Sequence, residues 1–200
     1  MIYAVTGERN SGKTQLLSDI YLSILKNADN PLFHKIKEEI PGVRGLTDSE
    51  PEIPLEKFSR PGGFLSLKTY SASLLIGYDI LDIRKAERFP FIRMSAEEEY
   101  DFTLGPFYFF SSGFKTAERI LIESREAHAD IFFIDEIGRM ELAGNGYTEL
   151  FSEALISFEN IIFTVRTPYL EDIIKKFGIK NVRVIKTGGL KGRRKNQQKT

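Results

Sequence analysis

The chain carries, close to its start, a spacing of residue types that could hold phosphate. Residues 5–17 read VTGERNSGKTQLL, where one glycine is followed by four residues and then by glycine, lysine and threonine. Glycines let successive backbone N–H groups turn toward phosphate oxygens, and the start of a helix adds the positive end of its dipole. We predict that the following residues bind nucleotide phosphates: Gly7, Glu8, Arg9, Asn10, Ser11, Gly12, Lys13, Thr14 and Gln15.

Two side chains of this loop have more specific predicted roles. Lys13 is placed to reach the β and γ oxygens of a nucleotide, and the hydroxyl of Thr14 is a ligand suited to Mg²⁺. The alternative is a glycine turn that only joins a strand to a helix. The flanking sequence favours the phosphate loop, which needs both elements. Residues 2–7, IYAVTG, predict a buried strand, and the apolar residues after the loop recur at helical spacing, as in Leu17, Ile20 and Ile24.

A second group of candidate residues lies in IFFIDEIGRMEL, residues 131–142. A continuous apolar run closed by two acids is typical of a strand buried on both faces of a parallel sheet. We predict that Asp135 holds Mg²⁺ through its water shell, and that Glu136 orients and deprotonates an attacking water. The alternative is a pair of strand-end acids exposed to solvent. The phosphate loop earlier in the chain favours the functional interpretation.

The order of predicted elements indicates an α/β fold. Strands are expected in residues 129–138, 160–167 and 181–188, and helices in residues 146–158 and 168–178. Alternating strands and helices predict a mostly parallel sheet with flanking helices. Residues 40–112 are instead rich in β-formers and punctuated by Gly and Pro, which predicts an antiparallel β insertion. We expect one domain over residues 1–190, followed by a basic flexible tail at 191–200.

Composition narrows the classes of partner. The 200 residues include 28 Lys and Arg and 28 Asp and Glu, so overall charge does not attract nucleic acid or anionic lipid. The tail alone has a positive excess, which leaves a nucleic-acid contact open there but makes a solvated terminus the better prediction. No cysteine is present, so thiolate chemistry is excluded. No apolar run approaches a membrane span, and we expect a cytoplasmic protein without a membrane partner. The sequence does not set the oligomeric state.

Three segments together resemble a known family, the small P-loop nucleoside triphosphatases first associated with thermophiles. They read GERNSGKT, GGFLSLKTYSASLLIGYDI and DEIGRMEL, and the last is the most specific. The resemblance implies a RecA-like core with a β insertion and slow, Mg²⁺-dependent hydrolysis of ATP, GTP or other NTPs to NDP and phosphate, with broad base tolerance. By the same resemblance, Lys13 and Thr14 contact phosphate and Mg²⁺, Asp135 supports the metal, and Glu136 is the base. Thr164 stands where the family also has a polar residue, and we include it among the catalytic candidates.

The chain also departs from the family pattern. The family has an arginine-rich stretch where this chain reads YSASLLIGYD, and the asparagine-arginine pair expected after the last strand is replaced by TGGLKGRR. An arginine aimed at the transferred phosphoryl group is worth roughly 10³ to 10⁵ in rate. Arg139 is the remaining candidate cation in this comparison, the alternative being an exposed loop arginine.

Several alternatives remain open at this stage. A small-molecule or nucleotide kinase could use the same loop, with Arg84, Lys85, Arg88 and Arg93 on a hairpin that bends over the phosphates, although a plain polar turn is the simpler interpretation. A non-catalytic NTP-binding switch would explain the missing arginines. FYFF, residues 107–110, is expected in the core rather than as a base-stacking platform. His34 and His128 lack acidic partners at ligand spacing, and EEEYD, residues 97–101, is expected to be a solvated face.

Overall fold

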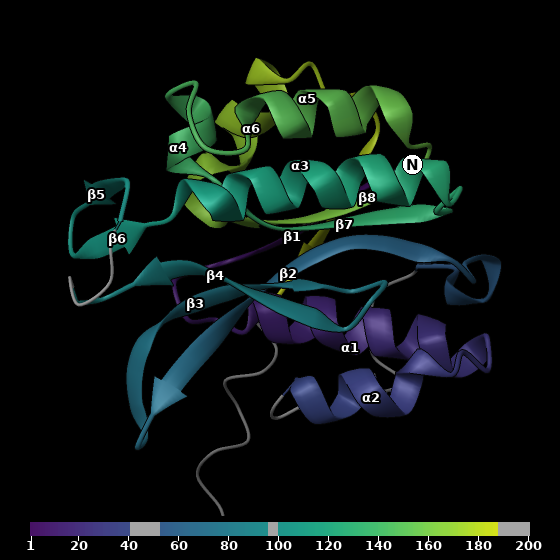
Figure 1. Cartoon of the computed structure of the whole chain (residues 1–200). Coiled ribbons are helices and arrows are strands. Elements are labelled where there is room, and N and C mark those ends of the chain that lie inside the picture. Colours follow the sequence, from purple (N-terminus) through teal and green to yellow (C-terminus); the bar gives the residue numbers. More distant parts are fainter. Residues whose placement is uncertain (41–52, 96–99, 188–200) are drawn as a thin grey trace, which may run out of the picture.

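A single nine-stranded sheet forms the centre of the molecule. The structure is a computed structural model that describes residues 1–40, 53–95 and 100–187. The strand order is β5-β6-β4-β3-β2-β7-β8-β1-β9, and helices lie on both faces of the sheet (Figure 1). This arrangement confirms the predicted α/β class. The basic tail and most of the acidic run at 97–101 lie outside the described residues.

One half of the sheet is parallel and places the candidate site. It contains β1 (Ile2–Gly7), β7 (Ile131–Ile137), β8 (Ile161–Arg166) and β9 (Val182–Lys186), with β2 (Pro61–Ser71) paired to β7. β1 lies between β8 and β9, and β8 lies between β7 and β1. Because parallel strands end at the same edge of a sheet, the phosphate loop after β1 and the acids of β7 meet there.

The other half is antiparallel and corresponds to the predicted β insertion. β2 pairs with β3 (Leu74–Asp82), which pairs with β4 (Glu87–Arg93), and β6 (Phe107–Phe109) and β5 (Phe102–Leu104) complete the edge. The insertion does not form a sheet of its own. Since β2 pairs with β7 on one side and β3 on the other, the inserted strands extend the parallel core.

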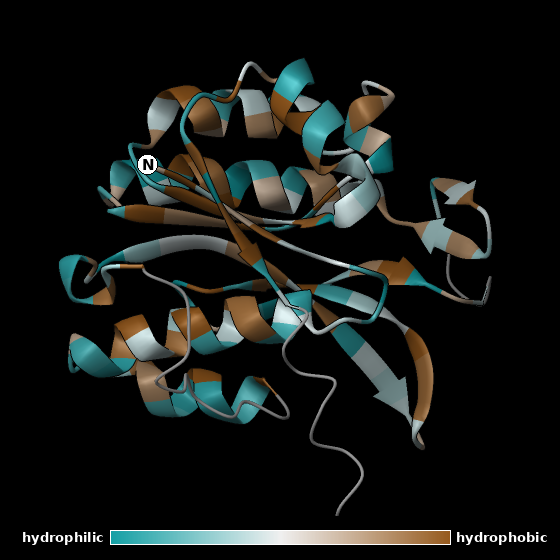
Figure 2. Cartoon of the chain, turned by 180° about the vertical axis from the view of Figure 1, so that it is seen from behind, coloured by the Kyte–Doolittle hydropathy of each residue, from teal (hydrophilic) through white to brown (hydrophobic). Residues whose placement is uncertain are grey.

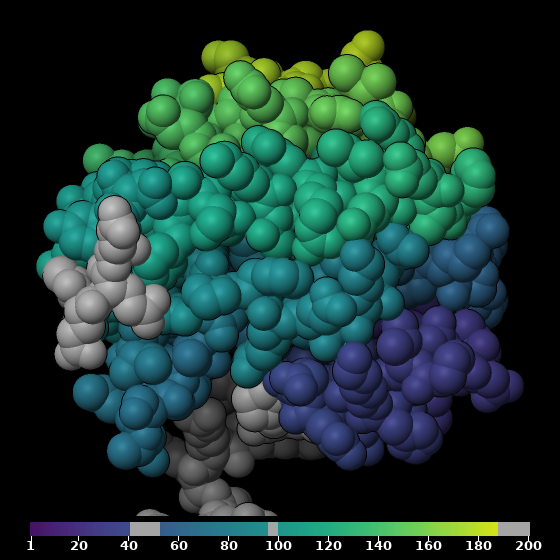
Figure 3. All heavy atoms as spheres, viewed as in Figure 1, coloured from purple at the N-terminus to yellow at the C-terminus, as the bar shows by residue number. Residues whose placement is uncertain are grey.

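Helices cover the two faces unequally. α1 (Lys13–Asn27) and α2 (Leu32–Glu39) lie on one face, and α3 (Ser111–Glu126), α4 (Arg139–Leu142), α5 (Thr148–Ser157) and α6 (Leu170–Lys176) on the other (Figure 1). The two short 3₁₀ turns are Leu55–Lys57 and Thr167–Tyr169. The space-filling view shows the same order at the surface, with α1 and α2 in purple and blue and the later helices in green (Figure 3).

Two apolar layers separate the sheet from these helices. Apolar segments of the helices and strands face one another on both sides of the sheet (Figure 2). The apolar face predicted for the first helix is fully covered, since Leu17, Ile20, Tyr21 and Ile24 have no exposed surface. Phe109 belongs to the other layer, and Phe107 packs against it, which supports the core interpretation of FYFF.

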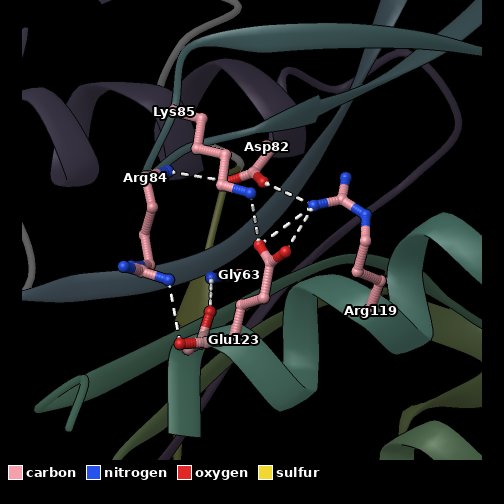
Figure 4. Close-up of polar contacts among 7 residues, drawn as sticks. Gly63, Asp82, Arg84, Lys85, Arg119 and Glu123 are labelled. Carbon is pink, nitrogen blue, oxygen red and sulfur yellow. Dashed lines mark hydrogen bonds and ion pairs between the residues drawn. The ribbon is translucent and has the colours of Figure 1, made fainter. Parts of the chain in front are cut away.

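The turn between β3 and β4 is fastened to α3 by charged side chains (Figure 4). Glu123 of α3 pairs with Lys85 at 2.7 Å and with Arg119 at 2.9 Å, and its carbonyl accepts a hydrogen bond from Arg84. β2 is parallel to β7, and β3 runs antiparallel to β2. The turn after β3 therefore lies at the amino ends of the parallel strands, whereas the phosphate loop lies at their carboxyl ends. The idea of a phosphate-covering hairpin is therefore wrong for Arg84, Lys85 and Arg88, because a turn at that edge cannot reach the loop. Arg93, at the far end of β4, pairs with Asp79 at 2.9 Å.

Candidate nucleotide site

The phosphate loop has the backbone shape that its glycines predict. β1 ends at Gly7 and α1 begins at Lys13, so residues 8–12 connect the strand directly to the helix. Gly12, at the start of α1, has a φ of 92°, and Asn10 has a φ of 58°. These left-handed conformations suit glycine and asparagine. The backbone amides therefore lie at a helix N-terminus, where an anion is stabilised.

The loop is tied to the strand at the edge of the sheet through Thr187. The Thr187 hydroxyl is 2.7 Å from the hydroxyl of Ser11, and its backbone N–H donates to the carbonyl of Thr6. A Cβ at Gly7 would collide with the side chains of Thr187 and Ser11. Glycine at this position thus allows β9 to hold the loop, a contact that the sequence pattern gave no sign of.

Lys13 folds back over the loop. Its Nζ donates to the carbonyl of Glu8 at 2.9 Å and to that of Gly7 at 3.2 Å, and the residue is 9% exposed. Burial lowers the pKa of Lys13, while the neighbouring charges of Glu136 and Asp135 act to raise it. The ammonium group therefore lies between the phosphate loop and the two acids of β7, as its predicted role requires.

Asp135 is buried, and each of its two carboxyl oxygens accepts a hydrogen bond. Its Oδ1 accepts a hydrogen bond from Thr164 at 2.7 Å and its Oδ2 accepts one from the backbone N–H of Ser66 at 3.1 Å. Burial is the largest cause that raises the pKa of Asp135, to about 6. The Thr14 side chain is close enough to this carboxyl group to lower its pKa slightly. The sequence did not indicate Ser66, because its contact uses the backbone N–H, which every residue except proline has.

The pairing of Thr14 with Asp135 fits a Mg²⁺ site. A hydroxyl and a carboxylate are hard oxygen donors, and Mg²⁺ is commonly held by one or two protein oxygens together with nucleotide phosphates and water. Within residues 1–40, 53–95 and 100–187, no group of three or more His, Cys, Asp or Glu side chains could hold a metal. His34 and His128 accordingly belong to no such group.

Glu136 lies on a bulge that turns it away from the sheet. The register between β7 and β8 shifts between Ile134 and Ile137, and Glu136 has a φ of 78°. Glu136 is exposed while Asp135 beside it is buried, so the two acids point to different surroundings. Bulges and left-handed non-glycine residues cost free energy and cluster at functional sites. The strained backbone therefore carries one exposed carboxylate beside one buried carboxylate.

Thr164 connects the two acids. Its hydroxyl donates to Asp135 Oδ1 and accepts a 2.8 Å hydrogen bond from the backbone N–H of Glu136. Thr164 is 1% exposed. Because its hydroxyl is used within the protein, Thr164 acts as a positioning residue for Asp135 and for the Glu136 bulge.

The segment after the acids is organised by Glu141. Its carboxylate accepts hydrogen bonds from the backbone N–H of Gly138 at 2.7 Å and of Tyr147 at 2.9 Å. Glu141 therefore joins the residue that follows β7 to the residue that precedes α5. Arg139, at the first position of α4, is exposed to solvent.

Tyr78 of β3 belongs to the GYDI segment of the family resemblance, but the sequence gave it no role in the site. Burial raises the pKa of its phenol, and the charge of Glu136 raises it further, whereas Arg9 lowers it. Tyr78 thus lies near both the phosphate loop and Glu136. The tyrosine itself was visible in the sequence, but only the pairing of β2 with β3 and β7 shows where it lies.

Comparison with known proteins decides the family. The family model described as NTPase matches residues 56–191, more than half of the chain. The chain is a member of the NTPase family. The matched segment of this NTPase includes Asp135, Glu136 and Thr164, and it begins after the phosphate loop.

Curated relatives and solved structures agree with this assignment. The chain is 27% identical over 117 residues to nucleoside-triphosphatase THEP1 of Pyrobaculum aerophilum, covering 58% of this chain and 63% of the relative. It is 28% identical over 131 residues to THEP1 of Pyrobaculum islandicum, covering 64% of this chain and 68% of the relative. The match to the first relative spans less than two thirds of that protein's length.

Two solved structures share the fold of this NTPase. The crystal structure of THEP1 from Aquifex aeolicus has a TM-score of 0.56 at 18% identity, covering 94% of this chain and 90% of that one. The solution structure of a human cancer-related nucleoside triphosphatase has a TM-score of 0.53 at 18% identity, covering 92% and 87%. The chain therefore has the same fold as these two structures.

Proposed function

We propose that this protein hydrolyses nucleoside triphosphates to nucleoside diphosphates and phosphate, slowly, with Mg²⁺ and with broad tolerance of the base. One observation supports the proposal above all others. The buried carboxyl of Asp135, held by Thr164 and Ser66, lies beside a second acid on a strained bulge and close to the Lys13 ammonium. Membership of the NTPase family supports the same reaction.

The residues divide the work between binding and proton transfer. The amides of the loop from Gly7 to Thr14 bind the phosphates, and Lys13 neutralises charge that develops on them. Thr14 and Asp135 would hold Mg²⁺, which supplies charge neutralisation at the β and γ oxygens. Thr164 keeps the Asp135 carboxylate and the Glu136 backbone in fixed positions. The rate then comes mainly from positioning and fixed charge.

Glu136 acts as the base in this proposal. An exposed carboxylate beside the ammonium of Lys13 can orient a water for in-line attack on the γ-phosphorus and accept its proton. The attacking water oxygen forms the new P–O bond, while the bond to the β–γ bridging oxygen breaks and the electrons go to the diphosphate. A kinase is less well supported, because the β3–β4 turn offered as a lid lies at the other edge of the sheet.

Phosphate release from Mg·ATP, Mg·GTP, Mg·CTP and Mg·UTP tests the proposal. We expect release from all four and a fall of about 10²- to 10⁴-fold in Glu136→Gln, with nucleotide affinity unchanged. Glu159→Gln, in an acid between α5 and β8, is the matched control and should retain full activity. Equal rates in Glu136→Gln and the unaltered protein would remove Glu136 from its role.

A further inference from the structure

Arg166 is the last residue of β8 and lies beside the phosphate loop. In the register of the parallel sheet it is paired with Gly7, the residue that ends β1 and begins the loop. Side chains two residues apart on a strand share a face, so Arg166 lies on the same face as Thr164. The strand that positions Asp135 and Glu136 thus also directs an arginine to the edge where the site is formed.

The contacts of Arg166 place it between the loop and the turn after Glu136. Its guanidinium group lies 5.5 Å from the ring centre of Tyr169. Tyr169 in turn lies against Gly138, where a Cβ would be 3.7 Å from the tyrosine ring. The positive charge of Arg166 also acts on Lys13. Burial is the main cause that lowers the pKa of Lys13, and the charge of Arg166 lowers it further, whereas Glu136 and Asp135 raise it. Arg166 is therefore close to both halves of the site.

One nitrogen of the Arg166 guanidinium, Nε, is a buried hydrogen-bond donor without an acceptor within the described part of the chain. No ion pair links Arg166 to an acid among the same residues. A buried donor without an acceptor costs free energy, and two neighbouring cations, Lys13 and Arg166, repel each other. A polyphosphate bound between them would relieve both costs.

We propose that Arg166 contacts the terminal phosphate of the bound nucleotide and is a catalytic residue for its hydrolysis. This inference rests on the proposed function. The family has arginines where this chain reads YSASLLIGYD and TGGLKGRR. In this proposal, Arg166 supplies the positive charge that those arginines would have supplied. It is better placed than Arg139, which is exposed on α4. Charge that develops on the γ-phosphate oxygens is stabilised most by a group already fixed in position, and packing on Tyr169 fixes Arg166.

The test compares triphosphate with diphosphate. In Arg166→Ala, and in Arg166→Met, which keeps the apolar stem on Tyr169, affinity for a non-hydrolysable NTP should fall about tenfold or more while affinity for NDP stays unchanged. The kcat of hydrolysis should fall roughly 10²- to 10³-fold, and Arg166→Lys should recover part of it. Unchanged NDP binding shows that the loop is still folded. Arg125→Ala, on α3, removes a surface ion pair with Glu153 on α5 and is the matched control, which should change neither quantity.

Two results would overturn the proposal. One is an equal loss of NTP and NDP affinity in both Arg166 variants. This would mean that Arg166 supports the phosphate loop or contacts the nucleobase, and does not contact the terminal phosphate. The other is an unchanged kcat in Arg166→Ala together with a large loss in Arg139→Ala. Failure of the proposed function looks different. The unaltered protein would then release no phosphate from any NTP, and the difference between NTP and NDP affinity would still decide the contact of Arg166.

Discussion

The hydroxyl of Thr164 donates a 2.7 Å hydrogen bond to the buried carboxyl of Asp135. The same oxygen accepts a hydrogen bond from the backbone of Glu136, the next residue. One side chain of β8 therefore holds both acids of β7 in place. This relationship explains why neighbouring acids have different environments, one buried and one exposed to solvent.

Thr164→Val is expected to weaken both the fold and the site. Valine has nearly the same shape but leaves a buried carboxyl oxygen and a backbone N–H without partners, which should lower the free energy of unfolding by about 1–3 kcal/mol. Thr164→Ser keeps the hydroxyl and should lose much less. Urea denaturation of the two variants beside the unaltered protein measures the difference. If valine and serine behave alike, the hydroxyl is not what holds the acids.

Glu136→Gly should make the protein more stable and inactive. Glycine adopts the left-handed conformation without the steric cost that glutamate bears, so the free energy of unfolding should rise by about 1 kcal/mol. Removal of the carboxylate should stop phosphate release. The matched control is His128→Gly, since His128 is exposed and has a φ of 51°. It should gain stability to a similar degree and keep full activity. A destabilised Glu136→Gly would argue against strain at the bulge.

Asp135 should make stability depend on pH. Burial raises its pKa from 3.8 to about 6, so the folded protein holds a proton between these values that the unfolded chain has released. Stability from this group is therefore present below about pH 4 and is lost as the pH rises to about 6, by about 3 kcal/mol. Unfolding of the unaltered protein and of Asp135→Asn, measured across this range without divalent metal, isolates the contribution. Parallel pH curves for the two proteins would contradict it.

The same shift predicts how Mg²⁺ binding depends on pH. A metal favours the deprotonated carboxylate, so affinity for Mg·nucleotide should fall as the pH drops below about 6. Titration of Mg²⁺ at fixed nucleotide concentration measures this dependence. Thr14→Ala serves as the comparison, because it removes the other candidate oxygen and should weaken Mg²⁺ binding at every pH.

Glu141 is expected to be a structural residue rather than a catalytic one. Glu141→Ala leaves the backbone N–H groups of Gly138 and Tyr147 without their acceptor, which should cost about 1–3 kcal/mol of stability. Thermal or urea unfolding measures the loss. Because the segment it closes begins two residues after Glu136, activity should also fall, whereas nucleotide affinity should stay close to normal. Loss of nucleotide binding with unchanged stability would contradict this role.

Much of the fold could be predicted because its signals are local. The apolar run before Asp135, the spacing of Leu17, Ile20 and Ile24, and the glycines of the phosphate loop each specify an element within a few residues. The helix predicted for residues 13–28 and the strand predicted within 129–138 are confirmed as α1 (Lys13–Asn27) and β7 (Ile131–Ile137). α2 was not predicted; it is short, and Ile36 is the one buried residue among its eight.

The placement of the hairpin shows where local signals fail. From the sequence, a lid at residues 84–93 stayed open beside the simpler interpretation as a polar turn, because residue type does not show at which end of the strands a turn lies. The direction of β3 decides that, and it follows from the pairing of β2 with β7. Thr187 and Ser66 were missed for the same reason, since their contacts join segments that are far apart in the chain.

The sequence by itself determined the phosphate loop, the acid pair and the α/β order, because each depends on neighbouring residues whose types and spacing have a direct physical meaning. Only the tertiary structure decided which acid is buried, which threonine holds it, and which arginine lies beside the loop. Those facts depend on strand order and register, which bring Asp135, Thr164 and Arg166 together from separate strands. Long-range pairing of this kind is fixed by the packing of the whole sheet, and no short stretch of residues records it.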